Sequence, residues 1–491
     1  MISMLAILSS PAVVLWLFAT RRPAVAVTVT VLGAYLLLPA NYSINLPAVP
    51  TLGKSSIPAL TAVLAAMIMI KGRRLQALGP DMVLPNLLPR SRIVRILLIL
   101  MLAGSIATVL TNGDVLHYGE RVQPALRPYD AASFFGNILF TLLPFFLARK
   151  YLAHPEAQRI LLVGLAVAGA LYALPALYEV RFSPQLSRTI YGYFPHDWRQ
   201  HLRAGGYRPV VFLPHGLWLA IFLCISFLAT LALWRSTSAQ SKSRWMMVAV
   251  WLFLTLVLAK GVGALGIALM LGVIILFLPV RLQVIGASLI AIALLTYPML
   301  RGAGLVPTEM AVNLAQGVDP DRASSLRFRL NNEDILLEKA NQRPAFGWGG
   351  WGRNRVISDE GQDLSVTDGY WVILIGTRGW IGYLAEYGLL LLPMVFLGLR
   401  WRHLALSPAT AGLAMALTAN MIDMIPNGTL TSVTWLMAGA LAGRLELGRL
   451  TETVGMPQAV GSQARASAYT RQTRRHPPIP PPSPSDGTVR T

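Results

Sequence analysis

The chain has 491 residues, of which 54% are hydrophobic and 13% are charged, and its mean hydropathy of +0.55 excludes an ordinary soluble enzyme. Its net charge of +20 at pH 7 would suggest a nucleic-acid partner in a soluble protein, but here the charges cluster between apolar runs. Runs of about 15–25 residues can cross a hydrocarbon core of roughly 30 Å as helices. The sequence therefore predicts an all-α polytopic membrane protein with no nucleic-acid partner.

Thirteen apolar runs are predicted as membrane helices. In chain order they cover 3–20, 24–40, 57–70, 96–111, 134–148, 160–178, 209–234, 245–259, 261–280, 283–300, 370–399, 408–424 and 429–447. The expected total is twelve to fourteen, because 370–399 also fits a short surface helix followed by a span. The first run has no preceding Lys or Arg, so we expect a retained helix rather than a cleaved signal peptide.

Basic residues follow alternate runs. Lys and Arg gather at 21–22, 71–95, 149–159, 235–244, 281, 400–402 and in the C-terminal tail. Short basic loops stay in the cytoplasm, so thirteen spans predict an outer N-terminus and a cytoplasmic C-terminus. The single cysteine, Cys224, lies inside an apolar run and has no intramolecular disulfide partner.

The predicted organisation has four parts. Residues 1–300 form a first transmembrane bundle, 301–369 a long periplasmic loop with a surface helix, and 370–450 the C-terminal transmembrane helices. The tail, 451–491, contains a proline-rich run and cannot build a core, so we expect it to be disordered and cytoplasmic.

The first long outer loop, about 179–208, is rich in arginine. Arg203 and Arg208 lie at its end, just before the segment Pro214-His215-Gly216. Guanidinium groups suit phosphate because they bind it bidentately, so an anionic ligand is one prediction. Pairing with acidic neighbours or contact with lipid headgroups is the alternative.

A lysine interrupts the apolar sequence between the eighth and ninth runs. Lys260 is followed by glycines at 261, 263 and 266. A lysine at this depth is costly unless it faces water, protein or a ligand, and glycines allow another backbone to approach closely. A lysine that snorkels beside a glycine packing face fits the same pattern.

The second outer loop carries a predicted surface helix at 324–340, which begins at Ser324 and ends before Pro344. Arg329 lies on this helix, four residues before Glu333, so a surface salt bridge is one explanation for it. The following glycine-rich segment contains Trp348 and Trp351, whose rings can lie against a sugar or anchor a turn at the membrane interface.

Asp368 lies at the mouth of the next run, followed by Tyr370 and Trp371. A carboxylate there can meet both a lipid-borne substrate and water, although Asp is also a good helix N-cap. Arg378 and Glu386 lie eight residues apart inside the run and are predicted to pair or to serve a polar cavity.

Four elements in this order resemble the O-antigen ligase and O-antigen polymerase superfamily of bacterial membrane glycosyltransferases. The segment 203–206 followed by Pro214-His215 is similar to the family's Arg-x-x-Gly and Pro-Asn elements. Lys260-Gly261 stands where the family usually has Ser-Arg. Arg329 precedes a Pro-x-x-Gly-x-Gly motif at 344–349.

The fourth element is Asp368, which has Gly379 and Gly382 at +11 and +14. It is similar to the family's helix that begins with His-Asn and carries two glycines, with aspartate in place of the common histidine. The resemblance covers about 200–390 and the general topology.

The resemblance implies a GT-C-like bundle in the bacterial inner membrane with a periplasmic active site. It implies an enzyme that polymerises undecaprenyl pyrophosphate-linked oligosaccharides into an O-antigen or exopolysaccharide, inverting and without a metal or other cofactor. Asp368 would be catalytic, and Arg203, Arg208, Lys260 and Arg329 would bind pyrophosphate. Trp348, Trp351, Tyr370 and Trp371 would bind glycan. Membrane lipid and a chain-length regulator are further candidate partners.

Four other functions are alternatives to a polymerase. A ligase would transfer the glycan to the lipid A core of lipopolysaccharide, or to protein. A metal-dependent transferase would use the carboxylates of Asp319 and Asp321. A transporter or flippase would show internal repeats and broken helices, and no convincing repeat is found. A membrane scaffold would not need the arginines and the glycine-tryptophan segment.

Overall fold

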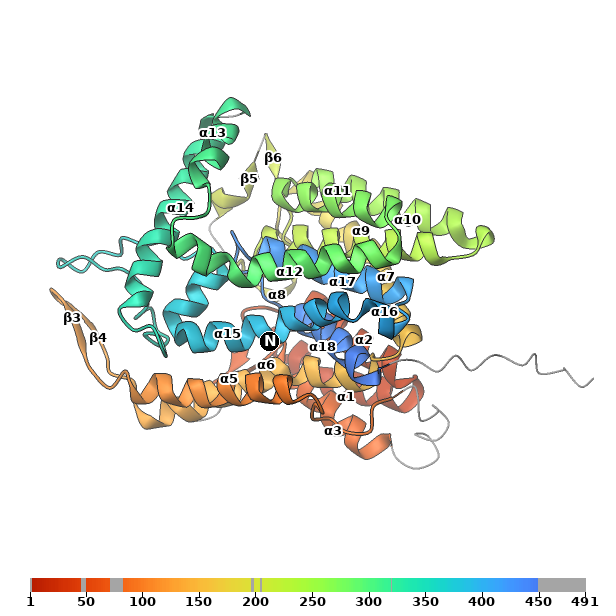
Figure 1. Cartoon of the computed structure of the whole chain (residues 1–491), viewed down its shortest axis with the longest axis horizontal. Helices are drawn as coiled ribbons and strands as arrows, with labels where there is room; N and C mark the ends of the chain where they lie inside the picture. Colours follow the sequence, from red (N-terminus) through yellow and green to blue (C-terminus); the bar gives the residue numbers. More distant parts are fainter. Residues whose placement is uncertain are drawn as a thin grey trace, which may run out of the picture. The chain divides into compact units, whose positions relative to one another are not determined.

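The structure, a computed structural model, describes residues 2–45, 50–70, 83–195, 198–203, 205–318 and 320–448 and is mostly helical (Figure 1). Within these ranges a helix overlaps each of the thirteen predicted apolar runs. The helices are α1 (Ile2–Thr20), α2 (Pro23–Leu37), α3 (Ser56–Met69), α5 (Arg92–Leu110), α6 (Pro128–Tyr151), α7 (Pro155–Phe182), α9 (Gly216–Ser236), α10 (Ala239–Leu258), α11 (Val262–Phe277), α12 (Val280–Gly302), α15 (Tyr370–Leu399), α17 (Pro408–Asp423) and α18 (Ser432–Leu447).

Eight of the described helices are long and apolar enough to cross a membrane, namely α1, α5, α6, α7, α9, α10, α12 and α15. Three more, α2, α3 and α11, are apolar but shorter. The outer faces of several helices expose large apolar side chains, such as Met247, Val250 and Leu254 on α10. Apolar surface of this extent has to be covered by something other than water. The fold is therefore that of a helical membrane protein.

Helices from the two ends of the sequence pack together. α18 packs on α6, α17 on α9 and α12 on α15, so the predicted segments 1–300 and 370–450 belong to one unit. Small residues make this contact close: a Cβ at Gly439 would lie 2.2 Å from the carbonyl oxygen of Phe145. Close backbone approach through glycine is a usual way for membrane helices to associate.

The connections at one end of the bundle, here called the basic end, are held by arginine. Arg149 pairs with Glu446 and donates to the carbonyl of Leu87 at 3.0 Å. Arg444 donates to the carbonyl of Leu404, and Arg235 to that of Leu278. These side chains fix the ends of neighbouring helices to one another. The short helix α16 (Trp401–Leu404) also lies at this end.

The opposite end, here called the loop end, carries the longer connections. Three antiparallel hairpins lie there: β1 (Ser43–Ile44) with β2 (Leu52–Gly53), β3 (Leu116–Tyr118) with β4 (Arg121–Gln123), and β5 (Leu202–Arg203) with β6 (Gly206–Tyr207). The helices there are α8 (Leu186–Tyr191), the 3-10 turn η1 (Trp198–His201), α13 (Thr308–Val318) and α14 (Pro320–Asn341). Figure 1 shows α13, α14 and the β3–β4 hairpin beyond the left ends of the long helices.

The predicted surface helix is longer than expected. α14 starts at Pro320 instead of Ser324, because proline fits the first turn of a helix, where its missing N–H costs nothing. Ser324 therefore lies inside the helix, and α13 before it was not predicted. The helix ends at Asn341, before Pro344, as predicted. Asp319 and the tail at 451–491 lie outside the described residues.

The run 370–399 forms one helix with a break, and its first segment is buried rather than a surface helix, because Trp371, Val372 and Ile375 pack inside the bundle. Gly379 has φ 68° and ψ −176°, which separates a short first segment of α15 from a longer second one. Glycine tolerates this conformation because it has no Cβ.

Candidate functional site

The β5–β6 hairpin and the α10–α11 connection bring Arg208 and Lys260 together. A Cβ at Gly206 would lie 2.5 Å from the Lys260 Nζ, so the ammonium group occupies the space that this glycine leaves. The Arg208 guanidinium donates to the Lys260 carbonyl at 3.4 Å, and its stem lies against Gly216 at the start of α9. The glycines of the arginine loop thus make room for two cations. The side chain of Arg203 lies outside the described part of the structure.

Arg329 and Asp368 form an ion pair, with 3.5 Å between Nε and Oδ2. Both side chains are half-exposed, at 38% and 36%. Glu333, the predicted partner of Arg329, is buried and accepts a hydrogen bond from the Tyr297 hydroxyl at 3.4 Å. The N-cap of α15 is Gly369, so the alternative prediction that Asp368 caps this helix is wrong.

Asp423, at the end of α17, connects these two pairs of residues. Arg208 and Arg329 both lie close enough to act electrostatically on its carboxylate. The Asp423 carboxylate accepts hydrogen bonds from Asn427 at 3.0 Å and Thr429 at 2.8 Å. The loop end therefore gathers Arg208, Lys260, Arg329 and Asp368, here called the cationic cluster, beside a buried second carboxylate. Asp423 could have been singled out from the sequence, because an aspartate at the end of an apolar run is rare without a function.

The arginine loop is positioned by a buried acid on α7. Glu179 is 1% exposed, and its carboxylate accepts backbone N–H bonds from Leu186 at 2.9 Å, Val210 at 2.7 Å and Val211 at 2.8 Å. The Tyr172 hydroxyl accepts a further bond from the Phe212 backbone. Backbone groups that would otherwise be buried without partners are thereby satisfied, which fixes the segment that carries Arg208.

The glycine-tryptophan segment binds to the break in α15. The backbone N–H groups of Trp348 and Gly349 donate to the carbonyls of Gly376 and Thr377, before the break, at 2.8 and 2.9 Å. After the break, Trp380 donates to the carbonyl of Pro344 at 2.8 Å. A Cβ at Gly379 would lie 2.3 Å from the Ala345 carbonyl oxygen, which explains the glycine there.

The predicted pair of Arg378 and Glu386 is confirmed. Their side chains lie 2.5 Å apart across the break, and the Tyr370 hydroxyl donates to the other oxygen of Glu386 at 2.5 Å. Glu386 is 1% exposed, so an ionised carboxylate there needs both partners.

The four predicted glycan-binding aromatics lie in different places. Trp351 is 73% exposed, and half-buried Tyr370 lines a cavity. Trp371 is completely buried and packs edge-on against Tyr297. Trp348 is also buried, with the Lys339 ammonium 3.7 Å from its ring centroid. Since a buried ring cannot stack on a sugar, glycan binding is corrected for Trp348 and Trp371. Trp348 instead donates to the Lys339 carbonyl, and Trp371 packs α15 against α12.

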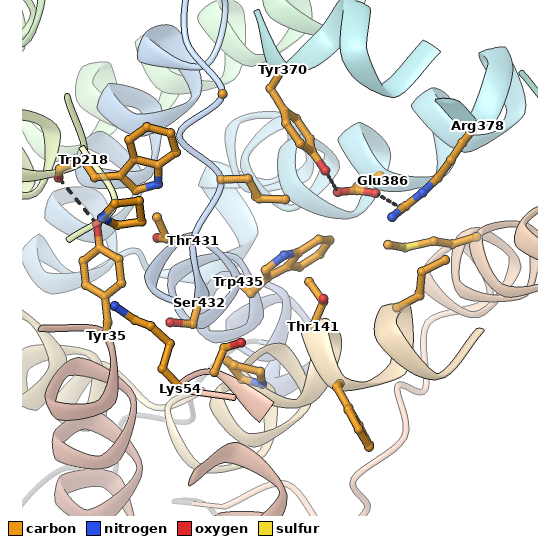
Figure 2. A pocket seen from close by; sticks show the side chains of 18 residues that line it. Tyr35, Lys54, Thr141, Trp218, Tyr370, Arg378, Glu386, Thr431, Ser432 and Trp435 are labelled. Atoms are coloured by element: carbon orange, nitrogen blue, oxygen red, sulfur yellow. Dashed lines mark hydrogen bonds and ion pairs between the residues drawn. The ribbon is translucent and has the colours of Figure 1, made fainter. Parts of the chain in front are cut away.

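A cavity of about 350 Å³ lies among α2, α5, α6, α9, α15 and α18 and the loop before α3 (Figure 2). Its lining includes Tyr35, Lys54, Trp218, Tyr370, Arg378 and Trp435. In Figure 2, Lys54 and Tyr35 lie on one side of the Trp435 indole and the Arg378–Glu386 pair on the other. Of these residues the sequence predicted a role only for Tyr370 and for the Arg378–Glu386 pair, since the other residues meet only when distant helices pack.

The cavity adjoins the cationic cluster. Its lining includes Gly428, where a Cβ would lie 3.6 Å from the Asp368 carbonyl oxygen, and Pro214, which precedes His215. A second cavity of about 280 Å³ shares Ile138 and Arg378 with the first and reaches Gly349 and Gly350. The backbone of Asp368 thus lies beside one edge of the first cavity.

The predicted metal site at Asp319 and Asp321 falls where the side chains are not described. In the described ranges, no three His, Cys, Asp or Glu side chains are grouped so that they could hold a metal ion. The cations of the cluster are protein side chains.

No protein-family model matches the chain, and a search of curated proteins finds no match either. The chemistry of the site therefore rests on its own residues. A carboxylate paired with one cation, with two further cations at the same end of a membrane bundle, can accept a proton next to a bound anion.

Proposed function

We propose that the protein is an inner-membrane glycosyltransferase that polymerises lipid-linked oligosaccharide repeats on the periplasmic face. The donor is an oligosaccharide on a polyprenyl pyrophosphate, and the acceptor is a hydroxyl of a second lipid-linked repeat. The observation that carries this proposal is the ion pair of Arg329 with Asp368 beside Arg208 and Lys260. Four separate elements contribute to one half-exposed, positively charged site.

In the proposed reaction, the acceptor oxygen attacks the anomeric carbon as the bond from that carbon to the pyrophosphate oxygen breaks. The acceptor proton passes to the Asp368 carboxylate, and the electron pair leaves with the pyrophosphate. Negative charge that develops on the leaving group is stabilised by cations already in place, which are Arg208, Lys260 and Arg329. Attack from the face opposite the leaving group inverts the anomeric carbon.

The basic end supports the proposed orientation. Arg149, Arg235 and Arg444 lie at that end of the bundle, where short basic connections favour the cytoplasm. The cationic cluster at the loop end then faces the periplasm, where lipid-linked repeats are joined.

The proposal is tested in cells that make lipid-linked repeats, with Asp368→Ala, Asp368→Asn and the matched control Asp359→Ala. Asp359 is an exposed aspartate of the same loop. We expect both Asp368 variants to accumulate single repeats, while the control gives a normal polymer ladder on a gel. A normal ladder from Asp368→Ala would refute the role of Asp368. Loss of glycan from the lipid A core, with the polymer itself unchanged, would point to a ligase.

A further inference from the structure

The cavity of Figure 2, between the loop that carries Lys54 and α15, has an unusual charge. Its described lining contains one carboxylate, Glu386, which is paired with Arg378. Lys54 is the second cation, so the cavity carries one positive charge in excess when Lys54 is protonated. A buried cation without a counter-ion is unfavourable, and a bound anion removes the cost.

Two donors at the cavity have no acceptor among the described residues. The Lys54 residue is half-buried, but its Nζ is buried and makes no hydrogen bond; its charge lies 5.7 Å from the centroid of the Tyr35 ring. The Nε1 of Trp435, a residue 1% exposed, is also buried without an acceptor. Burial lowers the pKa of Lys54 to about 7. Buried donors are normally satisfied, so two in one cavity indicate a missing acceptor.

Lys54 is held in place by its own loop. The Ser56 hydroxyl accepts from the Gly53 backbone at 2.8 Å and donates to the Thr51 carbonyl at 3.1 Å. The Thr51 N–H in turn donates to the Asn137 side chain on α6 at 3.2 Å. The backbone that carries Lys54 is therefore fixed beside the cavity.

The remaining lining suits a sugar better than a lipid chain. Tyr35, Trp218 and Tyr370 supply aromatic rings, and Thr141, Thr431 and Ser432 supply hydroxyl groups (Figure 2). Aromatic faces cover the apolar face of a sugar ring, while hydroxyls exchange hydrogen bonds with its edge. The volume of about 350 Å³ lies at the small end of the range for small-molecule sites, roughly 300–1,000 Å³.

We propose that this cavity binds a carboxylate-bearing sugar, so that the substrate glycan contains an acidic residue next to the bond being formed. The carboxylate contacts Lys54 and the Trp435 N–H, and the ring lies against the aromatic side chains. This inference rests on the proposed function for the identity of the glycan, but the binding itself does not depend on catalysis.

The test is isothermal titration calorimetry on the full chain in detergent, with glucuronic acid, glucose and inorganic phosphate as probes. We expect the Kd for glucuronic acid to be at least tenfold lower than that for glucose. Lys54→Met should remove this difference, and Trp435→Phe should weaken glucuronic acid binding severalfold while the protein stays folded. Lys242→Met is the matched control, because Lys242 lies 5.5 Å over the Trp234 ring at the basic end and should change nothing.

Three results would overturn the inference: equal binding of glucuronic acid and glucose, unchanged preference in Lys54→Met, or phosphate binding as tight as glucuronic acid and equally dependent on Lys54. The last would assign the cavity to a phosphate group. Asp368→Ala protein should bind glucuronic acid as the unaltered protein does. If the protein binds glucuronic acid no better than glucose while Asp368→Ala abolishes the polymer, this inference fails and the proposed function stands. If the protein prefers glucuronic acid through Lys54 while Asp368→Ala makes normal polymer, the proposed function fails and the sugar site stands.

Discussion

Two arginines at the loop end, Arg353 and Arg329, are held by the protein in opposite ways. Arg353 is completely buried and donates to the carbonyls of Trp348, Asp114 and Pro124 and to the Asp114 carboxylate, all at 2.9–3.1 Å. Arg329 is 38% exposed, and its ion pair with Asp368 is 3.5 Å long. A saturated, buried guanidinium stabilises structure, whereas a half-exposed one beside a loosely held carboxylate can bind an anion.

Replacing Arg329 should give the largest effect on activity. Arg329→Gln removes a cation from the proposed leaving-group site, so we expect polymer formation to fall about 10²–10³-fold with nearly unchanged stability. Arg327→Gln is the control on the same helix, because Arg327 is 53% exposed and pairs with Glu309 at 3.7 Å. Both variants are compared by polymer yield and by thermal unfolding. Equal loss in the two variants would contradict the assignment of Arg329.

Arg353→Ala should instead reduce stability. It removes a buried hydrogen bond to the Trp348 carbonyl, the bonds to the carbonyls of Asp114 and Pro124, and one of the two guanidinium partners of the Asp114 carboxylate. We expect a loss of about 3 kcal/mol, the low end for a broken buried pair, because Asp114 is 43% exposed. Arg343 continues to lower the pKa of Asp114 through its hydrogen bonds. Arg355→Ala, two residues further along, is the control. It breaks the ion pair of Arg355 with Asp363, whose side chains are 42% and 24% exposed, and should lower the free energy of unfolding by under about 1 kcal/mol. Similar unfolding temperatures for the two variants would show that Arg353 contributes no more to stability than the exposed Arg355.

Gly379→Ala tests whether the break in α15 is a requirement. The positive φ and the Ala345 carbonyl 2.3 Å from the new Cβ should cost about 1–3 kcal/mol or shift the loop. Gly263→Ala is the control, since a Cβ there meets nothing within 4 Å. Thermal unfolding of the two proteins measures the difference. If Gly379→Ala is as stable as the unaltered protein, α15 can continue as a regular helix through residue 379 and the break is not required.

Glu333→Gln should give the smallest and most conditional effect. Burial raises the pKa of Glu333 from 4.5 to about 7, so its stabilising contribution is complete below pH 4.5 and is lost as the pH rises through 7. The glutamine side chain does not ionise, so the variant does not lose stability in this pH range. We therefore expect equal unfolding temperatures near pH 4.5 and a more stable variant at pH 8. If the difference in unfolding temperature between the two proteins is the same at both pH values, the effect comes from the changed hydrogen bond to Tyr297 and not from ionisation of Glu333.

The sequence predicted the helices well, because apolar run length is a local property. It also predicted the Arg378–Glu386 pair, but not the kink at Gly379, whose cause is the loop backbone that packs against it. It failed where burial depends on packing: Trp348 and Trp351 are three residues apart in the same glycine-rich segment, yet one is buried under Lys339 and the other is 73% exposed. Lys54 could not be singled out from the sequence, since the other residues of its cavity come from six helices, α2, α5, α6, α9, α15 and α18, and from loops.

The hydrogen bonds across the break in α15 also bear on motion. Trp348 and Gly349 donate to α15 carbonyls before Gly379, and Trp380 donates to the loop after it. The loop therefore cannot lift away without breaking bonds on both sides of the break. Amide hydrogens of Trp348 and Trp380 should exchange with solvent in one cooperative opening, and Arg378 should move with them. The Arg378 side of the cavity is therefore part of one cooperative unit with the glycine-tryptophan segment.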